Sequence, residues 1–184
     1  MKYTTPTLET ERLRLGRGTE ADFARVYEFN FCHLRDIDGD FAFVRQDPSI
    51  AADFVTYADE EDAMDWIIYK KDTGTPIGNI TADRPVEEIG AMELSFNLHP
   101  DFWGREYMKE AAVAVMRHLF SLGFDAILCG YSEGNRKSKR LTEKLGFSPY
   151  AVKENAWMKN GHPITDYICI LHRSTIDALY SNQG

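Results

Sequence analysis

The stretch 101-DFWGREYMKEAA-112 joins an aromatic pair, one glycine and two opposite charges to a segment with helical character. A turn of this kind can bind phosphate, because the first backbone N–H groups of a helix are unpaired and lie at the positive end of its dipole. Gly104 gives the backbone clearance and Arg105 adds a cation, whereas Glu106 places an anion where a phosphate would bind. Taken alone, the stretch fits both a phosphate-binding turn and an ordinary helix entry.

Length and composition predict one globular domain over residues 1–184. Hydrophobic residues make up 43% of the chain and charged residues 27%, which is a globular balance. We expect no membrane segment and no signal peptide, because no apolar run approaches ~20 residues and the N-terminus lacks an apolar core. The three cysteines are odd in number and widely spaced, so we expect no metal site, reduced thiols and a cytoplasmic location.

The charge is distributed unevenly along the chain. Its net value is −8, which argues against nucleic acid as a partner. Residues 103–144 nevertheless carry eight Lys/Arg against five Asp/Glu, a net +3. Either this basic segment binds an anion or it forms the solvated faces of two helices.

Hydrophobic periodicity predicts a mixed α and β chain, with antiparallel hairpins around one strand–helix–strand–helix unit. The predicted strands are Thr7–Leu15, Ala63–Lys71, Pro76–Ala82, Met92–Leu98, Ala126–Tyr131, Ala151–Met158 and Ile164–Leu171. The predicted helices cover residues 20–29, Met108–Leu119, Arg136–Leu145 and a short segment after Ser174. The run 36-DIDGD-40 does not predict a calcium loop, because its glycine is misplaced and the closing glutamate is missing.

A second motif, 134-GNRKSKRLTEKLGF-147, follows the first at a distance of about one helix and one strand. Asn135 precedes a predicted helix with a strongly basic face, and such a face can hold phosphate groups. The plainer alternatives are a helix N-cap for Asn135 and a solvated surface for the basic residues Arg136, Lys137, Lys139, Arg140 and Lys144.

The two motifs together resemble the GNAT superfamily of acetyl-CoA-dependent N-acetyltransferases. The branch that includes the ribosomal-protein N-terminal acetyltransferases is the most similar, and the opening LETERLRL and the closing NG hairpin fit it too. The resemblance covers roughly residues 7–173. It implies a single α+β domain of GNAT type, whose mostly antiparallel central sheet splays into a V-shaped cleft flanked by helices.

The resemblance also implies a set of cofactor-binding residues. Phe96, Asn97 and Leu98 would bond the pantetheine of acetyl-CoA through their backbone, and Asn135 and Ser138 would meet the pantetheine arm or the thiol. Lys144 or a neighbouring cation would lie near the nucleotide. The pyrophosphate would be wrapped by Trp103, Gly104, Arg105, Glu106, Tyr107 and Met108.

Glu106 and Thr142 depart from the pattern that the resemblance implies. Glu106 stands where relatives have a glycine that lets backbone N–H groups approach the pyrophosphate. It can still offer its N–H if its side chain turns outward, toward Arg105 or Lys109. Thr142 stands where many relatives carry a tyrosine that serves as general acid. These departures favour the alternative function, a non-catalytic acyl-CoA-binding or sensor module on the same fold.

The implied reaction is direct transfer of an acetyl group from the thioester to a primary amine through a tetrahedral intermediate. Glu93 is the candidate base, because strand parity puts it opposite the apolar stripe of Met92–Leu98; a solvated strand face is the alternative. Ser138 is the candidate acid; the alternative is a serine bonded to the backbone at a helix start. A leaving thiolate needs little help, since a thiol has a pKa near ~8.5.

The acceptor is expected to be a small-molecule or peptide amine. The acidic remainder, and 36-DIDGDFAFVRQD-47 in particular, hints at a cation such as a peptide N-terminus, a polyamine or an aminoglycoside. Trp157 and Tyr167 lie on the predicted terminal hairpin, where relatives line the acceptor pocket; core packing is the alternative. A monomer and a homodimer are both left open.

Overall fold

The computed structural model describes residues 3–32, 56, 63–159 and 161–180. The run 36-DIDGD-40 and the acidic stretch over residues 36–47 lie outside this part of the chain.

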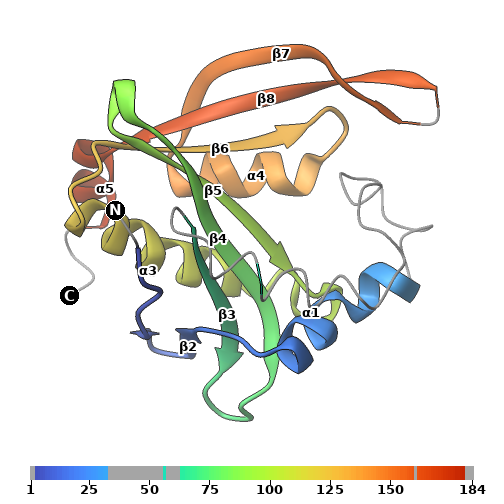
Figure 1. The fold of residues 1–184 in the computed structure, drawn as a ribbon, viewed down its shortest axis with the longest axis vertical. Coiled ribbons are helices and arrows are strands. Elements are labelled where there is room, and N and C mark those ends of the chain that lie inside the picture. The colour runs from blue at the N-terminus through green and yellow to red at the C-terminus, as the bar shows by residue number, and fades with distance from the viewer. Residues whose placement is uncertain (1–2, 33–55, 57–62, 160, 181–184) are drawn as a thin grey trace.

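Within the described residues, eight strands form one mixed sheet in the order β1-β2-β3-β4-β5-β6-β8-β7 (Figure 1). Neighbouring strands pair antiparallel except β5 and β6, which pair parallel. The predicted α+β class with a mostly antiparallel sheet is therefore confirmed. The strands are β1 Leu8–Glu9, β2 Leu13–Gly16, β3 Met64–Lys70, β4 Pro76–Val86, β5 Ala91–Leu98, β6 Ala126–Ser132, β7 Ser148–Lys159 and β8 His162–His172.

The helices of the described part lie close to their predicted positions: α1 Glu20–Cys32, α3 Tyr107–Ser121, α4 Arg136–Leu145 and α5 Arg173–Tyr180. Helix α4 has the predicted bounds because both of its ends carry local signals. The side chain of Asn135 accepts from Ser138 N at 3.0 Å, and Gly146 ends the helix at φ 90°. None of the helices in the described residues combines the length and apolarity needed to span a bilayer.

The main core lies between the sheet and helix α3. The strand β5 alternates as predicted, so Met92 and Leu94 are buried in this core. Helix α3 contributes a matching apolar stripe that includes Ala111, Val115 and Leu119, each fully buried. The opposite face of β5 carries Glu93, Ser95 and Asn97.

The predicted strand Thr7–Leu15 is wrong in one respect, because a tight turn divides it into β1 and β2. Thr10 N donates to Leu13 O at 2.9 Å, and Leu13 N donates to Thr10 Oγ1 at 3.0 Å. These local bonds replace strand pairing at the turn. The chain then folds back, and Leu8 of β1 pairs with Leu15 of β2.

The sheet splits at the parallel pair. β5 and β6 are in register over three residues, which end at Glu93 opposite Leu128. Beyond that point β5 stays paired with β4 as far as Leu98, while β6 follows β8 as far as Ser132. Figure 1 shows the two strands diverging, with α4 beside β6. The expected V-shaped splay is therefore present.

Candidate active site

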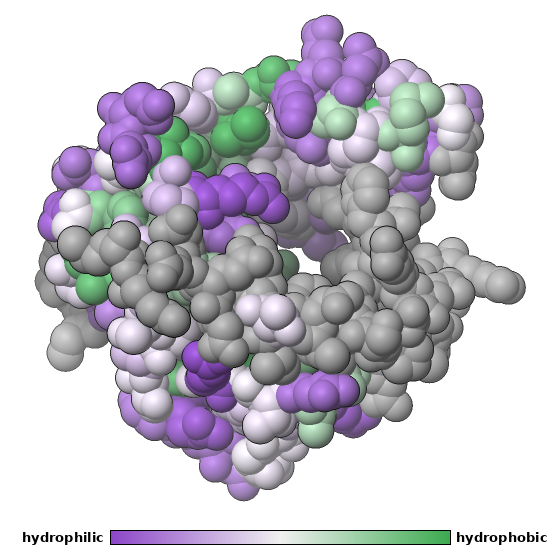
Figure 2. All heavy atoms as spheres, in the orientation of Figure 1, coloured by the Kyte–Doolittle hydropathy of each residue, from purple (hydrophilic) through white to green (hydrophobic). Residues whose placement is uncertain are grey.

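A cavity of about 750 Å³ fills the opening between β5 and β6. Figure 2 shows the surface hollowed below the β7–β8 hairpin. Of the predicted site residues, Arg105 does not line the cavity. Those that do are Glu93, Phe96, Asn97, Leu98, Trp103, Gly104, Glu106, Tyr107, Met108, Asn135, Ser138 and Lys144.

Successive residues of β5 point their backbone N–H and C=O groups alternately toward β4 and toward the splay. His99 N donates to Ile77 O of the neighbouring strand segment at 2.8 Å, and in an antiparallel pair the hydrogen-bonded positions alternate. The register therefore directs the backbone of Asn97 toward β4 and that of Phe96 and Leu98 toward the splay. Asn97 can reach the cavity through its side chain, and Phe96 presents backbone groups to it.

The loop before α3 has two residues in the left-handed region, Gly104 at φ 73° and Glu106 at φ 62°. Its entry is fixed by Trp103, whose indole Nε1 donates to Leu98 O at 2.7 Å. The ammonium group of Lys137 lies 3.6 Å from the centre of the Trp103 ring. The loop is thus attached to both the end of β5 and the start of α4.

Glu106 turns its side chain toward α4. Its Oε1 lies 2.6 Å from Lys144 Nζ, so the partner is Lys144 and not Arg105 or Lys109. The hydrogen bond from Lys144 is the main cause that lowers the pKa of Glu106. Both side chains are about half exposed, so the pair contributes little to stability but brings an anion and a cation together at the cavity mouth.

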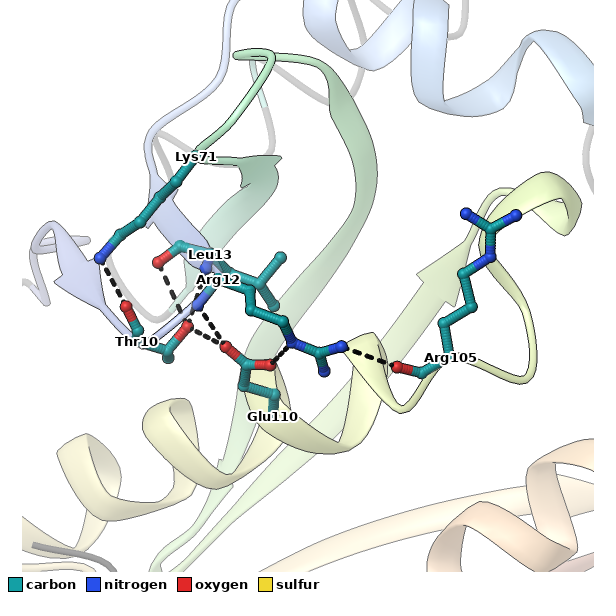
Figure 3. Close-up of polar contacts among 6 residues, drawn as sticks. All are labelled: Thr10, Arg12, Leu13, Lys71, Arg105 and Glu110. Carbon is teal, nitrogen blue, oxygen red and sulfur yellow. Dashed lines mark hydrogen bonds and ion pairs between the residues drawn. The ribbon is translucent and has the colours of Figure 1, made fainter.

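A network that sequence reasoning missed holds the same loop from the outside. The carboxylate of Glu110 accepts from Thr10 Oγ1 at 2.6 Å and from Arg12 Nε at 2.6 Å (Figure 3). The guanidinium group of Arg12 also donates to the carbonyl oxygen of Arg105 at 3.2 Å. Burial alone would raise the pKa of Glu110, but these hydrogen bonds outweigh it and lower the pKa below its ordinary value.

This network sets the direction of one peptide group. The carbonyl of Arg105 and the N–H of Glu106 belong to the same trans peptide, so they point in opposite directions. Because Arg12 holds the carbonyl on its side, the N–H of Glu106 points away from Arg12. Figure 3 shows the side chain of Arg105 extending away from the network, in agreement with its absence from the cavity lining.

The first turn of α4 brings Ser138 to the cavity, with its backbone N–H bonded to Asn135 Oδ1. Thr142 is 1% exposed and its hydroxyl donates to Lys139 O at 2.8 Å, so it has no access to the cavity. The phenol of Tyr131 also belongs to the lining. Its pKa is raised, mainly by burial.

Glu93 lies at the point where the two strands separate. Its Oε1 is 3.2 Å from Arg84 NH1, and Arg84 has φ 50° at an irregularity in β4. The side chain of Glu93 is 39% exposed, so it is open to the cavity. Nearby Cys129 also lines the cavity, and burial, followed by the charges of Cys169 and Glu93, raises its pKa.

The far wall carries a second polar cluster that the sequence did not reveal. Ser132 Oγ donates to Asp166 Oδ1 at 2.5 Å, and Trp157 Nε1 donates to the same oxygen at 3.1 Å. All three residues line the cavity, which for Trp157 is one of the two alternatives left open by the sequence. Tyr167 instead stacks on Tyr131 with ring centres 5.3 Å apart. A period-2 pattern cannot show that Ser132 and Asp166 face one another, because they are partners on different strands.

Comparisons with known proteins place this architecture among the acetyltransferases. The family model described as Acetyltransferase (GNAT) domain matches residues 12–148. The uncharacterised N-acetyltransferase YoaA of Bacillus subtilis (strain 168) is 26% identical over 162 residues, which cover 86% of this chain and 92% of YoaA.

Two solved structures share the fold at low sequence identity. The ribosomal-protein-S5-alanine acetyltransferase from Vibrio fischeri matches with a TM-score of 0.73 at 16% identity, over 91% of this chain and 96% of its own. The microcin C7 self-immunity acetyltransferase MccE, solved in complex with acetyl-CoA and AMP, also matches with a TM-score of 0.73 at 16% identity. That match covers 89% of this chain and 93% of the MccE chain.

The fold and the cleft agree with those that the resemblance of the two sequence motifs implies. Because the family model covers well over half of the chain, the protein belongs to the GNAT acetyltransferase family. It is therefore an N-acetyltransferase, and the expected use of acetyl-CoA is confirmed as a property of that family.

Proposed function

We propose that the protein transfers the acetyl group of acetyl-CoA to a primary amine of a small molecule or peptide, and that the cavity between β5 and β6 is where it does so. The main observation in support of this proposal is the splay between β5 and β6. It leaves the backbone groups of Phe96 unpaired with β6 in a cavity of about 750 Å³, bordered by a loop and two helices.

The residues present fit acetyl-CoA. The backbone of Phe96 suits the amide groups of the pantetheine, and the first N–H groups of α3 suit the pyrophosphate. On α4, the cations Lys137, Arg140 and Lys144 line the same cavity and suit the phosphates. Bound acetyl-CoA supplies the thioester, an acyl group ready for attack by an amine.

Glu93 is the proposed base. The C–N bond forms before the C–S bond breaks, and the amine must lose a proton, which Glu93 takes directly or through one water molecule. Arg84 lies beside the carboxylate, with NH1 3.2 Å from Oε1 of Glu93. The position of Glu93 at the vertex of the splay supports this role, because the residue lines the same cavity as those proposed to hold acetyl-CoA.

Ser138 is the proposed acid that returns a proton to the leaving sulfur. It lines the cavity from the first turn of α4. The buried hydroxyl of Thr142 is committed to Lys139 O, so it does not compete. Tyr131 is the alternative donor, because its phenol borders the same cavity.

A non-catalytic acyl-CoA sensor is the second candidate for this site. The ion pair between Glu106 and Lys144 favours it, because both charges lie where phosphate would bind. Release of free CoA during incubation with acetyl-CoA and a panel of primary amines separates the two functions. We expect turnover with at least one amine, about 100-fold slower for Glu93→Gln, with CoA binding retained in calorimetry.

Turnover of no amine with CoA binding intact would favour the sensor, and loss of CoA binding in the native protein would overturn both functions. Ser138→Ala and Tyr131→Phe form a matched pair: the variant with the larger fall in kcat at unchanged CoA affinity identifies the acid. A cytoplasmic location stays a prediction from the cysteine pattern.

A further inference from the structure

One face of the sheet carries two groups of polar residues, one on each side of the cavity, which we call arms. The register pairs Ala91 with Ala126 and Glu93 with Leu128, so alternate residues of β5 and β6 share this face. The β5 arm therefore holds Glu93, Ser95 and Asn97. The other arm holds Ser132 and its cross-strand partner Asp166 on β8.

Asp166 is a carboxylate held in a fixed orientation. One oxygen, Oδ1, accepts from both Ser132 and Trp157, which fixes the plane of the carboxylate. The second oxygen, Oδ2, has no hydrogen-bond partner among the described residues. Lys153 is its register neighbour on β7 and lines the same cavity, yet the two form no ion pair in this part of the chain. Asp166 is thus positioned to accept from a ligand.

A second observation on the same face also points to a ligand. Asn97 belongs to the cavity lining and is 9% exposed. Neither its amide oxygen nor its amide nitrogen has a hydrogen-bond partner among the described residues. A buried amide without partners is costly, so a ligand that both donates and accepts would satisfy it.

We propose that this face selects an acceptor amine that carries a second cationic group, with Asp166 as the residue that binds the second cation. The inference rests on the proposed acetyl transfer, with the reacting nitrogen at Glu93. Ser132 lies four residues beyond Leu128, the partner of Glu93, which is roughly 13 Å along the strand. The acceptor is therefore a long dication, and Asp166 determines specificity.

The test compares α,ω-diaminoalkanes of increasing chain length with monoalkylamines of equal length at saturating acetyl-CoA. In the native protein we expect kcat/KM to rise with the length of the diamine and to reach an optimum. The monoamines should show no optimum at the same length. Asp166→Asn, which keeps the size of the side chain, should lower kcat/KM for the best diamine on the order of tenfold or more. The rates with monoamines should fall less, so that the diamine-to-monoamine ratio falls.

Several controls keep the outcomes distinct. Asp166→Glu should restore part of the preference, Ser132→Ala should weaken it less than Asp166→Asn does, and thermal unfolding checks that each variant folds. Peptides with a lysine a few residues from a free N-terminus, assayed in parallel, distinguish a peptide source of the dication from a small polyamine.

An unchanged diamine-to-monoamine ratio in Asp166→Asn would overturn the inference, and so would a native protein with no preference for diamines. If the native protein turns over no amine at all, the proposed function fails separately. Calorimetric binding of the long diamine in the presence of CoA then tests the subsite, and it must be lost in Asp166→Asn for the inference to stand.

Discussion

Glu106 keeps a left-handed backbone conformation, φ 62° and ψ 11°, at the position where the family pattern has glycine. A side chain in this conformation costs roughly 1–2 kcal/mol relative to glycine. The backbone of the loop therefore has the conformation that glycine would give it, although position 106 carries a side chain. The carboxylate pairs with Lys144 at the cavity mouth, so an anion and a cation lie together beside the proposed phosphate site.

Replacing Glu106 should therefore strengthen the binding of CoA. We expect Glu106→Gly to lower the dissociation constant of CoA by about threefold or more, because it removes the anion beside the proposed phosphate site. Glu106→Gln is the matched control, since it removes the charge and keeps the left-handed residue. Calorimetry on both variants separates the charge from the conformation, and equal or weaker binding by both would show that Glu106 is no electrostatic penalty.

At the scale of elements, the turn before β2 and helix α3 are joined through Arg12 and Glu110. The guanidinium group reaches both the carboxylate of Glu110 and the carbonyl of Arg105, a combination that needs its forked set of donors. Arg12 also lies over the ring of Tyr107, 4.5 Å from its centre. The N-terminal hairpin thereby holds the loop in the orientation that sends the N–H of Glu106 the other way.

Arg12→Lys should impair this support, because a single ammonium group cannot bridge both partners. We expect the KM for acetyl-CoA to rise on the order of tenfold, with the KM of the acceptor unchanged. Lys71→Ala is a suitable control, since Lys71 contacts Thr10 in the same network without reaching the loop (Figure 3). Steady-state kinetics check the prediction, and equal effects of the two substitutions would contradict it.

Elements with local signals were predictable from the sequence, and contacts between distant segments were not. Periodicity gave β5 and its two faces, and the cap residues gave both ends of α4. The turn at Thr10 was missed because side-chain bonds there replace a strand pattern. The ion pair of Arg12 with Glu110 and the bond of Ser132 to Asp166 join different elements, so no spacing in the chain points to either.

At the scale of the whole molecule, the proposed sites would give the two substrates separate approaches to the splay. Helices α3 and α4, with the basic residues of the second motif, flank the side proposed for acetyl-CoA (Figure 1). The opposite face carries Glu93, Asn97 and Asp166, the groups proposed to meet the amine. The proposed arrangement would let both ligands bind at once, so that the acetyl group passes directly to the amine without an acetylated form of the protein.

The kinetic pattern should show a ternary complex. Cys129 is the thiol that borders the cavity, but burial raises its pKa, so it stays a thiol and is a poor nucleophile. We expect intersecting lines when acetyl-CoA and amine are varied together, and no acetylated protein by mass spectrometry after incubation with acetyl-CoA alone. Cys129→Ala should keep the same pattern. Parallel lines, or an acetyl group on Cys129, would contradict direct transfer, because each requires an acetylated protein that forms before the amine binds.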